Sequence, residues 1–450
     1  MGYIKEKFAA KATPLAAEIK ELIKNNSDVV LGTYNVGQAY GGMKSIIALV
    51  TETSLLDANE GIRFRGYTIP ELREKLPHLE SCNEPLPEGL FYLLLLDEIP
   101  TYKDVQHVAN VWARRAIVPL HVFKVIDRLP RETHPMTQFS IGIMAMQTES
   151  NFSRAYREGI SKKEYWDPMY EDVMTLIARL PRVAAYIYRR SYKRGKHIEP
   201  NPELDWAANF AHMLGYDQPD FYSYMRLFLT IHADHEGGNV SAHTTHLVGS
   251  TLSDAYLSFA SGMNGLAGPL HGLANQEVIR WILEMKKNLG KGGLTKEEIE
   301  HYIRQTLSEG KVVPGYGHAV LRKTDPRFLA QMEFAKKHCP DDELVNIVWN
   351  VYDVAPKILG ESGKIKNPWP NVDAHSGSLL VHYGLTEYDF YTVLFGVSRA
   401  LGVLASLVWD RALAQGIERP KSVTTGWIKD FISKNAAKKE TPATTTTAEQ

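Results

Sequence analysis

The apolar stretch over residues 390–409 constrains the fold more than any other part of this sequence. It is about long enough to cross a bilayer as a helix, yet Arg399 lies at its middle. A charge at the centre of a bilayer costs about 2.5 to 3.5 kcal/mol, and the sequence has no second span of this kind. We therefore predict a long helix buried in protein, in which Arg399 needs a polar partner. Thr386 and Asp389 resemble a capping box ahead of it.

Helix signals dominate the rest of the chain. Asn201 as a cap, Pro202 in the first turn and Gly215 as the stop signal predict a helix over 201–215. Apolar residues at helical spacing over 274–285 predict a second helix that begins after Gly272. The sequence therefore favours a mainly α fold.

Strand signals are scarce. Residues 46–50 and 62–64, separated by the turn sequence Asp-Ala-Asn-Glu-Gly, predict a small hairpin near the N-terminus. Strands and helices do not alternate afterwards, so we do not expect a parallel α/β sheet. The Gly-Tyr-Gly at 315–317 also lacks the strand that would precede a dinucleotide-binding turn.

Composition limits the possible partners. The 450 residues carry a formal net charge of −1, which gives no general attraction to nucleic acid or to an anionic membrane. Two cysteines, Cys82 and Cys339, are too few for a disulfide framework, so we expect both to be packing residues in a reducing compartment. The N-terminus shows neither a secretory nor a transit peptide. Residues 435–450, rich in threonine, are predicted to be disordered.

The segment 311–327 combines flexible turns with positive charge. Gly315 and Gly317 let the backbone approach a ligand closely, and Pro314 and Pro326 stiffen the flanks. The acid/base group of the segment is His318. Its cations are Lys311, Arg322, Lys323 and Arg327. Such a segment is suited to hold an anion beside an acid/base group.

Four histidines between 232 and 246 allow two interpretations. His232 with His235, and His243 with His246, have the spacing of metal ligands on a helix, which would fit a metal-dependent hydrolase. The alternative is that they are packed histidines, of which the first two lie near a helix end before Gly237. We expect no metal, because few carboxylates lie nearby to support one.

His271 and Asp373 are candidates for proton chemistry. His271 precedes a predicted helix, where the positive end of the dipole favours a neutral imidazole that could donate to an enolate oxygen. Asp373 follows Trp369 and Pro370 and could be a general base with a raised pKa. The plain alternatives are a histidine near a helix cap and an N-capping aspartate.

Two arginines are in positions that call for an anion. Arg327 stands in the first turn of a predicted helix, where the dipole disfavours a cation. Arg399 has no carboxylate one turn away in its apolar helix. Together they suggest a di- or tricarboxylate ligand held through bidentate forks. Structural ion pairs with distant acidic residues are the alternative.

Four long motifs, in this order, resemble citrate synthase of the mitochondrial type. They are residues 230–243 (TIHADHEGGNVSAH), 264–272 (NGLAGPLHG), 312–318 (VVPGYGH) and 367–375 (NPWPNVDAH). The resemblance runs from about Gly41 to Lys421. It implies an all-helical fold of two domains: a large domain from 1–273 and 381–434, and a small domain over 274–380, followed by the tail.

The resemblance also implies roles for individual residues. Asp373 would remove a methyl proton from acetyl-CoA, His271 would stabilise the enolate, and His318 would polarise and protonate the carbonyl of oxaloacetate. The residues implied to hold oxaloacetate are His235, His318, Arg327 and Arg399, with Arg419 from the partner subunit of a homodimer.

The same resemblance implies a set of contacts to CoA, which would be a substrate and carrier, with no further cofactor. Lysines stand at 44 and 162, where arginine is expected, so charge is kept without the guanidinium fork. The implied contacts are Lys44, Lys162, Val312, Val313, Pro314, Gly315, Tyr316, Gly317, Arg322, Lys364 and Lys366.

The implied activity is that of an acyltransferase that condenses acetyl-CoA with oxaloacetate and hydrolyses the thioester to citrate and CoA. Synthesis of 2-methylcitrate from propionyl-CoA is a close alternative, because one methyl group gives little discrimination. A catalytically silent helical binding protein is a third. The chain begins about where a processed mitochondrial enzyme would begin, which favours a bacterial cytoplasmic protein, with a mature matrix enzyme as the alternative.

Overall fold

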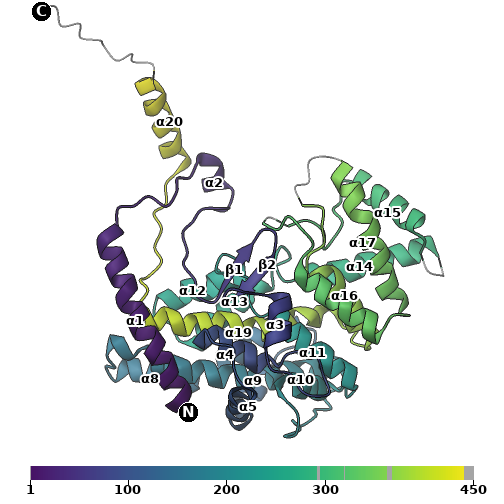
Figure 1. The fold of residues 1–450 in the computed structure, drawn as a ribbon, viewed down its shortest axis with the longest axis horizontal. Helices are drawn as coiled ribbons and strands as arrows, with labels where there is room; N and C mark the ends of the chain where they lie inside the picture. The colour runs from purple at the N-terminus through teal and green to yellow at the C-terminus, as the bar shows by residue number, and fades with distance from the viewer. Residues whose placement is uncertain (1, 291–293, 319, 362–366, 440–450) are drawn as a thin grey trace, which may run out of the picture.

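The computed structural model describes residues 2–290, 294–318, 320–361 and 367–439, and these are mainly helical (Figure 1). The mainly α fold predicted from the sequence is confirmed. The α-helices are α1 (Gly2–Asn26), α2 (Val36–Tyr40), α3 (Ile69–Lys75), α4 (Pro87–Leu96), α5 (Tyr102–Arg115), α6 (Leu120–Asp127), α7 (Pro135–Ala145), α8 (Asn151–Arg157), α9 (Trp166–Tyr192), α10 (Trp206–Leu214), α11 (Pro219–Ile231), α12 (Val240–Ser250), α13 (Ala255–Leu266), α14 (Ala274–Leu289), α15 (Lys296–Ser308), α16 (Pro326–His338), α17 (Glu343–Glu361), α18 (Asp373–His382), α19 (Tyr391–Ala412) and α20 (Thr425–Lys439). Short 3-10 turns are η1 (Met146–Glu149), η2 (Lys162–Glu164) and η3 (Tyr388–Phe390).

The long apolar helix α19 lies at the centre of the larger body. Helices α4, α7, α9, α11, α12 and α13 pack around it. Among the described residues one helix, Tyr388–Ala412, is long and apolar enough to cross a membrane, and 94% of its most apolar window is buried in the protein. The prediction of a buried core helix is therefore confirmed. The predicted capping box is wrong: α19 follows η3, and its N-cap, Phe390, has no side-chain cap.

The predicted helix starts are partly corrected. The helix predicted from Asn201 is α10, which begins at Trp206 because Asp205 caps it by accepting a hydrogen bond from the Ala208 N–H. It ends as predicted, at Gly215 with φ of +100°. Helix α14 begins at Ala274, as the spacing indicated.

The predicted hairpin is present but its first strand is misplaced. Antiparallel strands β1 (Ser54–Asp57) and β2 (Gly61–Phe64) flank the predicted turn, and β3 (Tyr67–Thr68) adds to β2. Residues 46–50 are not a strand. The apolar content of residues 46–50 favoured a strand there. Pairing across the short turn instead places the first strand directly before the turn, at β1.

A second, smaller hydrophobic core lies within residues 278–374. It is built by α14, α15, α16 and α17, which gather on one side of the molecule in Figure 1. These elements fall inside the range predicted for the small domain. The boundaries at 274 and 380 stay a prediction.

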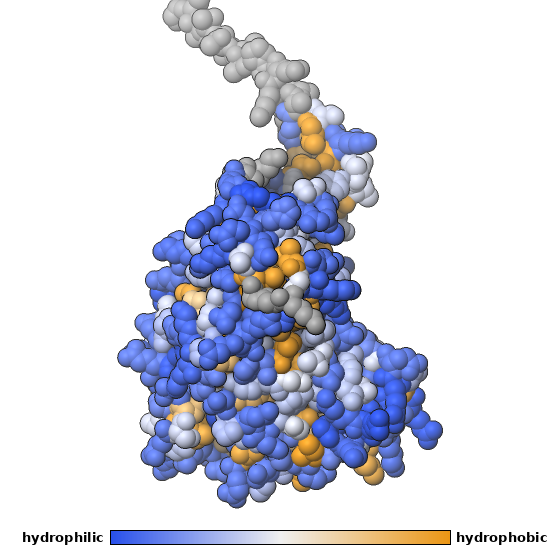
Figure 2. All heavy atoms as spheres, turned by 90° about the vertical axis from the view of Figure 1, so that its right-hand side faces the viewer, coloured by the Kyte–Doolittle hydropathy of each residue, from blue (hydrophilic) through white to orange (hydrophobic). Residues whose placement is uncertain are grey.

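Helices α2 and α20 project away from the body, with α1 leading toward them (Figure 1). Figure 2 shows apolar side chains on this arm. Exposed apolar residues of these segments include Val29, Val30, Leu31, Tyr34, Trp427, Phe431 and Ile432. Helix α20 continues to Lys439, so the first part of the range predicted to be disordered is helical, and residues 440–450 lie outside the described residues.

Replacing Gly402 in α19 should destabilise the protein. A Cβ at this position would lie 2.4 Å from Cβ of Asp234 and 2.5 Å from the carbonyl oxygen of Ala233. We expect Gly402→Ala to lower the free energy of unfolding by about 1 to 3 kcal/mol, the usual cost of overpacking, in urea denaturation. Gly416→Ala, where a Cβ meets nothing within 4 Å, is the control. Equal midpoints for the two variants would contradict this packing.

Candidate active site

Arg399 is a buried cation without an ion-pair partner among the described residues. Its side chain, on α19, is 1% exposed. Nε donates to the carbonyl oxygen of His232 (3.2 Å), and Nη1 donates to Oδ1 of Asn239 (2.9 Å) and to Oγ of Ser241 (3.2 Å). Burial lowers the pKa of Arg399 to about 10, which the charge of Asp234 partly opposes. The guanidinium is held by neutral oxygens, so its positive charge remains available to an anion.

His271 is neutral, and the backbone N–H of Ser241 favours one position for its ring proton. It lies in the turn between α13 and α14, where the Ser241 N–H donates to its Nε2 (3.2 Å). A backbone N–H can only donate, so Nε2 offers its lone pair and the proton sits on Nδ1. Burial, helped by Arg399, lowers the pKa of His271 to about 4. The predicted neutral state is supported, but its cause is burial rather than the helix dipole.

His318 has the opposite arrangement of its ring protons. Nδ1 accepts from the N–H groups of Val320 (3.0 Å) and Leu321 (3.1 Å), so Nε2 carries the proton of the neutral ring. Burial and then the charge of Arg327 lower the pKa of His318. The ring of His235, whose pKa burial also lowers strongly, lies 5.5 Å away between centroids. Two neutral imidazoles therefore meet at this point.

The loop 312–318 is tied to the segment that leads to Asp373. The Gly317 N–H donates to the carbonyl of Trp369 (3.2 Å), and the Asn371 N–H donates to the carbonyl of Gly315 (2.9 Å). Gly315 has φ of +79°, and a Cβ there would lie 3.0 Å from Ala374. Glycine is needed here because the loop both adopts a left-handed conformation and packs directly on α18.

Asp373 is the first residue of α18 but does not cap it. The N-cap is Val372, which makes no side-chain hydrogen bond to the helix. Burial raises the pKa of Asp373 to about 6, while the positive charge of Arg327 acts in the opposite direction. The plain alternative of an N-capping aspartate is wrong, and the raised pKa fits the predicted base.

Arg327 is paired with a residue that the sequence analysis did not identify as part of the site. Its Nε donates to Oδ1 of Asp325 (3.0 Å), and its Nη2 donates to Oδ2 (2.7 Å). Both side chains are buried. The anion that offsets the unfavourable position of Arg327 at the positive end of the helix dipole is therefore Asp325 of the same chain. In the hydrogen bonds found among the described residues, Nη1 of Arg327 takes no part and is left for a ligand.

The four histidines separate into two pairs with different surroundings. Helix α11 ends at Ile231, so His232 and His235 lie beyond it, and Nδ1 of His232 contacts the carbonyl of Phe228 (2.9 Å). His243 and His246, on α12, contact carboxylates instead. No group of three His, Cys, Asp or Glu residues in the described part of the chain is arranged to hold a metal ion. These contacts give the hydrolase interpretation no support.

Some implied substrate contacts do not reach this site within one chain. Lys44 and Lys162 are exposed, and neither is bonded to loop 312–318 among the residues described. Arg419 is exposed on the segment between α19 and α20. Lys364 and Lys366 lie outside the described residues. Arg322 borders the site, and its backbone N–H donates to the carbonyl of Ala58 in the β1–β2 turn (2.7 Å).

Three further residues belong to the site and were missed: Asn239, Ser241 and Asp325. Asn239 and Asp325 are the N-caps of α12 and α16, and Ser241 joins Arg399 to His271. A cap signal was visible at Asp325-Pro326. It gave no indication that the capping side chain of Asp325 also pairs with Arg327.

Comparison with known proteins identifies the family. The family described as "Citrate synthase, C-terminal domain" matches residues 42–421. The chain belongs to the citrate synthase family. The mitochondrial citrate synthase of Daucus carota is 58% identical over 418 residues, which is 93% of this chain and 88% of the relative. The mitochondrial 2-methylcitrate synthase of Yarrowia lipolytica is 57% identical over 424 residues, covering 94% and 91%.

Solved structures agree with this membership. The crystal structure of citrate synthase from Pyrobaculum aerophilum has a TM-score of 0.73 at 28% identity, over 86% of this chain and 92% of that one. The predicted all-helical citrate synthase fold is thereby confirmed, and the chain is an enzyme of this family.

The protonation of His271 can be tested by NMR. In protein labelled with ¹⁵N-histidine, the signals lost in His271→Gln should be those of a neutral ring with the proton on Nδ1 at neutral pH, because the pKa is depressed to about 4. An imidazolium signal, or a proton on Nε2, would contradict the contact with Ser241. His121, exposed to solvent, provides an internal comparison through His121→Gln.

Proposed function

We propose that this protein condenses acetyl-CoA with oxaloacetate and hydrolyses the resulting thioester to citrate and CoA. The observation that carries the proposal is that two buried arginines, Arg327 and Arg399, act on Asp373, whose pKa is raised, while Arg327 also acts on the neutral His318 and Arg399 on the neutral His271. A carbon nucleophile made by proton abstraction needs a base, an oxyanion donor and a place for the charges of the electrophile. Membership of the citrate synthase family supports the same reaction.

The first step is formation of the nucleophile. The carboxylate of Asp373 takes a proton from the methyl group of acetyl-CoA, and its pKa of about 6 makes it a stronger base than an ordinary aspartate. The N–H on Nδ1 of His271 donates to the thioester oxygen as negative charge develops there. Because the ring of His271 stays neutral, it does not take up the proton that Asp373 removes, and its N–H remains available to stabilise the enolate.

The second step is carbon–carbon bond formation. The enolate carbon attacks the keto carbon of oxaloacetate, and the keto oxygen takes the proton on Nε2 of His318 and becomes the hydroxyl of the citryl thioester. The proton that Asp373 removed in the first step restores the proton of His318. Arg399 and the free Nη1 of Arg327 are positioned for the carboxylates of oxaloacetate, with His235 beside them. Water then cleaves the carbon–sulfur bond, which releases citrate and CoA.

The CoA contacts are proposed for the loop 312–317 and Arg322, together with Lys44, Lys162, Lys364 and Lys366. The loop is joined by backbone hydrogen bonds to the segment before Asp373, so a ligand on the loop lies close to the base. CoA acts as substrate and carrier, and the proposed reaction uses no other cofactor. The proposed reaction would make the protein an acyltransferase.

A homodimer is proposed for the working enzyme. Arg419 lies on the segment that leads from the body of the subunit to α20. The arm formed by α2 and α20 exposes apolar side chains that a second subunit would cover (Figures 1 and 2). Arg419 would then complete the oxaloacetate site of the partner. The two relatives compared above are mitochondrial, so we favour the alternative of a mature matrix enzyme over a bacterial cytoplasmic one.

Substrate preference decides between the two activities found among relatives. With oxaloacetate present, release of the CoA thiol should be faster from acetyl-CoA than from propionyl-CoA, compared as kcat/KM. Equal or better use of propionyl-CoA would make 2-methylcitrate synthesis the main activity. CoA binding without thiol release would indicate a silent binding protein.

Asp373→Asn should lower kcat by about 10²- to 10⁴-fold, the usual contribution of a general base, while oxaloacetate still binds. Asp353→Asn is the control, because that carboxylate only pairs with Lys296 on the surface. In the unmodified enzyme kcat/KM should fall as pH drops below about 6, since the base must be ionised and its pKa is about 6. Near-normal activity of Asp373→Asn would refute the assignment.

A further inference from the structure

Two histidines left without a role by the reaction, His243 and His246, face the segment that carries Arg419. They lie one turn apart on α12. Nε2 of His243 is 2.9 Å from Oε2 of Glu418, and Nε2 of His246 is 3.1 Å from Oε1 of the same carboxylate. The Glu418 N–H also donates to Oγ of Ser250, at the end of α12 (3.1 Å). Glu418, directly before Arg419, is therefore anchored on α12.

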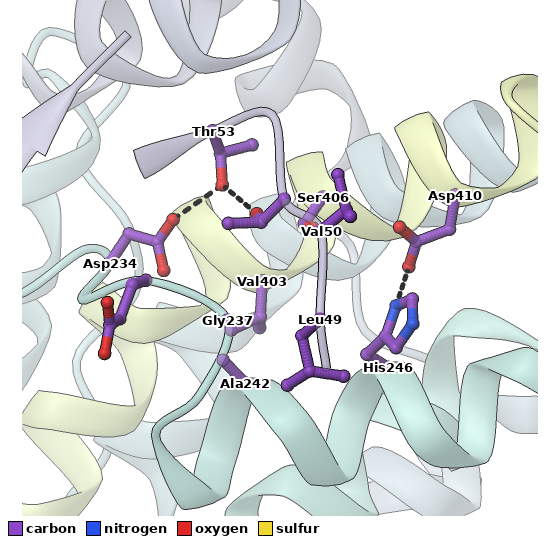
Figure 3. Close-up of a pocket in the computed structure, with 12 residues that line it drawn as sticks. Leu49, Val50, Thr53, Asp234, Gly237, Ala242, His246, Val403, Ser406 and Asp410 are labelled. Atoms are coloured by element: carbon purple, nitrogen blue, oxygen red, sulfur yellow. Dashed lines mark hydrogen bonds and ion pairs between the residues drawn. The ribbon is translucent and has the colours of Figure 1, made fainter. Parts of the chain in front are cut away.

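His246 contacts a carboxylate through each ring nitrogen. Its Nδ1 is 2.6 Å from Oδ2 of Asp410, which lies on α19 (Figure 3). A neutral imidazole carries a single proton, so one of its nitrogens would point a lone pair at a carboxylate oxygen. The contact with Asp410 is a hydrogen bond, whereas Nε2 approaches Oε1 of Glu418 without hydrogen-bond geometry, so this second contact is purely electrostatic. The two carboxylates therefore favour a protonated His246.

The charges around His246 favour this form. Asp410 faces it from α19 and Glu418 from the following segment, and Asp234 and Glu236 line the same small hollow of about 20 Å³ (Figure 3). The nearby cation Arg411 is directed at the carbonyl oxygens of Gly249 and Ser253. Burial lowers the pKa of His246, but the contacts with Asp410 and Glu418 outweigh it and raise the pKa above its ordinary value.

We propose that His246, assisted by His243, is a positioning residue that holds Glu418. It thereby fixes the position of Arg419, which extends into the oxaloacetate site of the partner subunit. The inference rests on the proposed function, including the role of Arg419 across a homodimer. When His246 loses its proton, one of its two carboxylate contacts becomes repulsive and the segment is released. Oxaloacetate is then bound less tightly, while the chemical step is unchanged.

The test is the separation of KM from kcat over a pH series. In the unmodified enzyme KM for oxaloacetate should rise with pH as His246 deprotonates. His246→Gln should have a KM for oxaloacetate raised roughly tenfold, in line with loss of a hydrogen bond to a charged group, and independent of pH over the same interval. Its kcat and its KM for acetyl-CoA should stay unchanged. Glu418→Gln should reproduce these effects if His246→Gln folds poorly.

His212→Gln is the matched control, because His212 also pairs with a carboxylate, Asp217 (2.6 Å), but lies away from Arg419. It should behave as the unmodified enzyme. In Arg419→Gln, KM for oxaloacetate should already be raised, and adding His246→Gln should raise it no further.

The outcomes distinguish a failure of the proposed role of Arg419 from a failure of the inference about His246. If Arg419→Gln leaves KM unchanged, the role of Arg419 in the proposed function is wrong, and the inference falls with it. If Arg419→Gln raises KM while His246→Gln and Glu418→Gln do not, the inference alone is overturned. Additive effects of His246→Gln and Arg419→Gln would likewise overturn it, because they would show that His246 acts by another route.

Discussion

The site depends on the guanidinium of Arg399, which is buried in the central helix and has no carboxylate in contact within the part of the chain that the structure describes. Arg399 donates hydrogen bonds to the carbonyl of His232 and to Asn239 and Ser241, whose accepting oxygens are neutral. Leaving a buried charge uncompensated is costly. The tight packing around α19 maintains this arrangement, and an anionic substrate would supply the missing charge. In the proposed function, the stability of the protein and the binding of its substrate would therefore depend on the same residue.

Burial sets the proton chemistry of the groups around it. Removing water disfavours charge on every side chain, which keeps His271, His318 and His235 neutral and raises the pKa of Asp373. Backbone N–H groups then decide which nitrogen of His271 and of His318 carries the proton. One physical cause, desolvation, thus raises the pKa of one carboxyl group and keeps the neighbouring imidazoles neutral at once.

The sequence supported correct predictions where a signal was local and long. The apolar run with a central arginine predicted a buried helix, Gly215 ended α10, and four long motifs indicated the family. Predictions failed where two local signals competed. Asp205 rather than Asn201 capped α10, and strand β1 formed beside its turn instead of over the more apolar residues 46–50.

What the sequence determined by itself was the helical class, the buried central helix and the family. Tertiary structure alone decided the rest, because each of these features depends on groups far apart in the chain. It joined Arg399 to His271 through Ser241, and brought His243 and His246 onto Glu418. Propensities and spacing describe neighbours along the chain, whereas burial and proton position follow from neighbours in space.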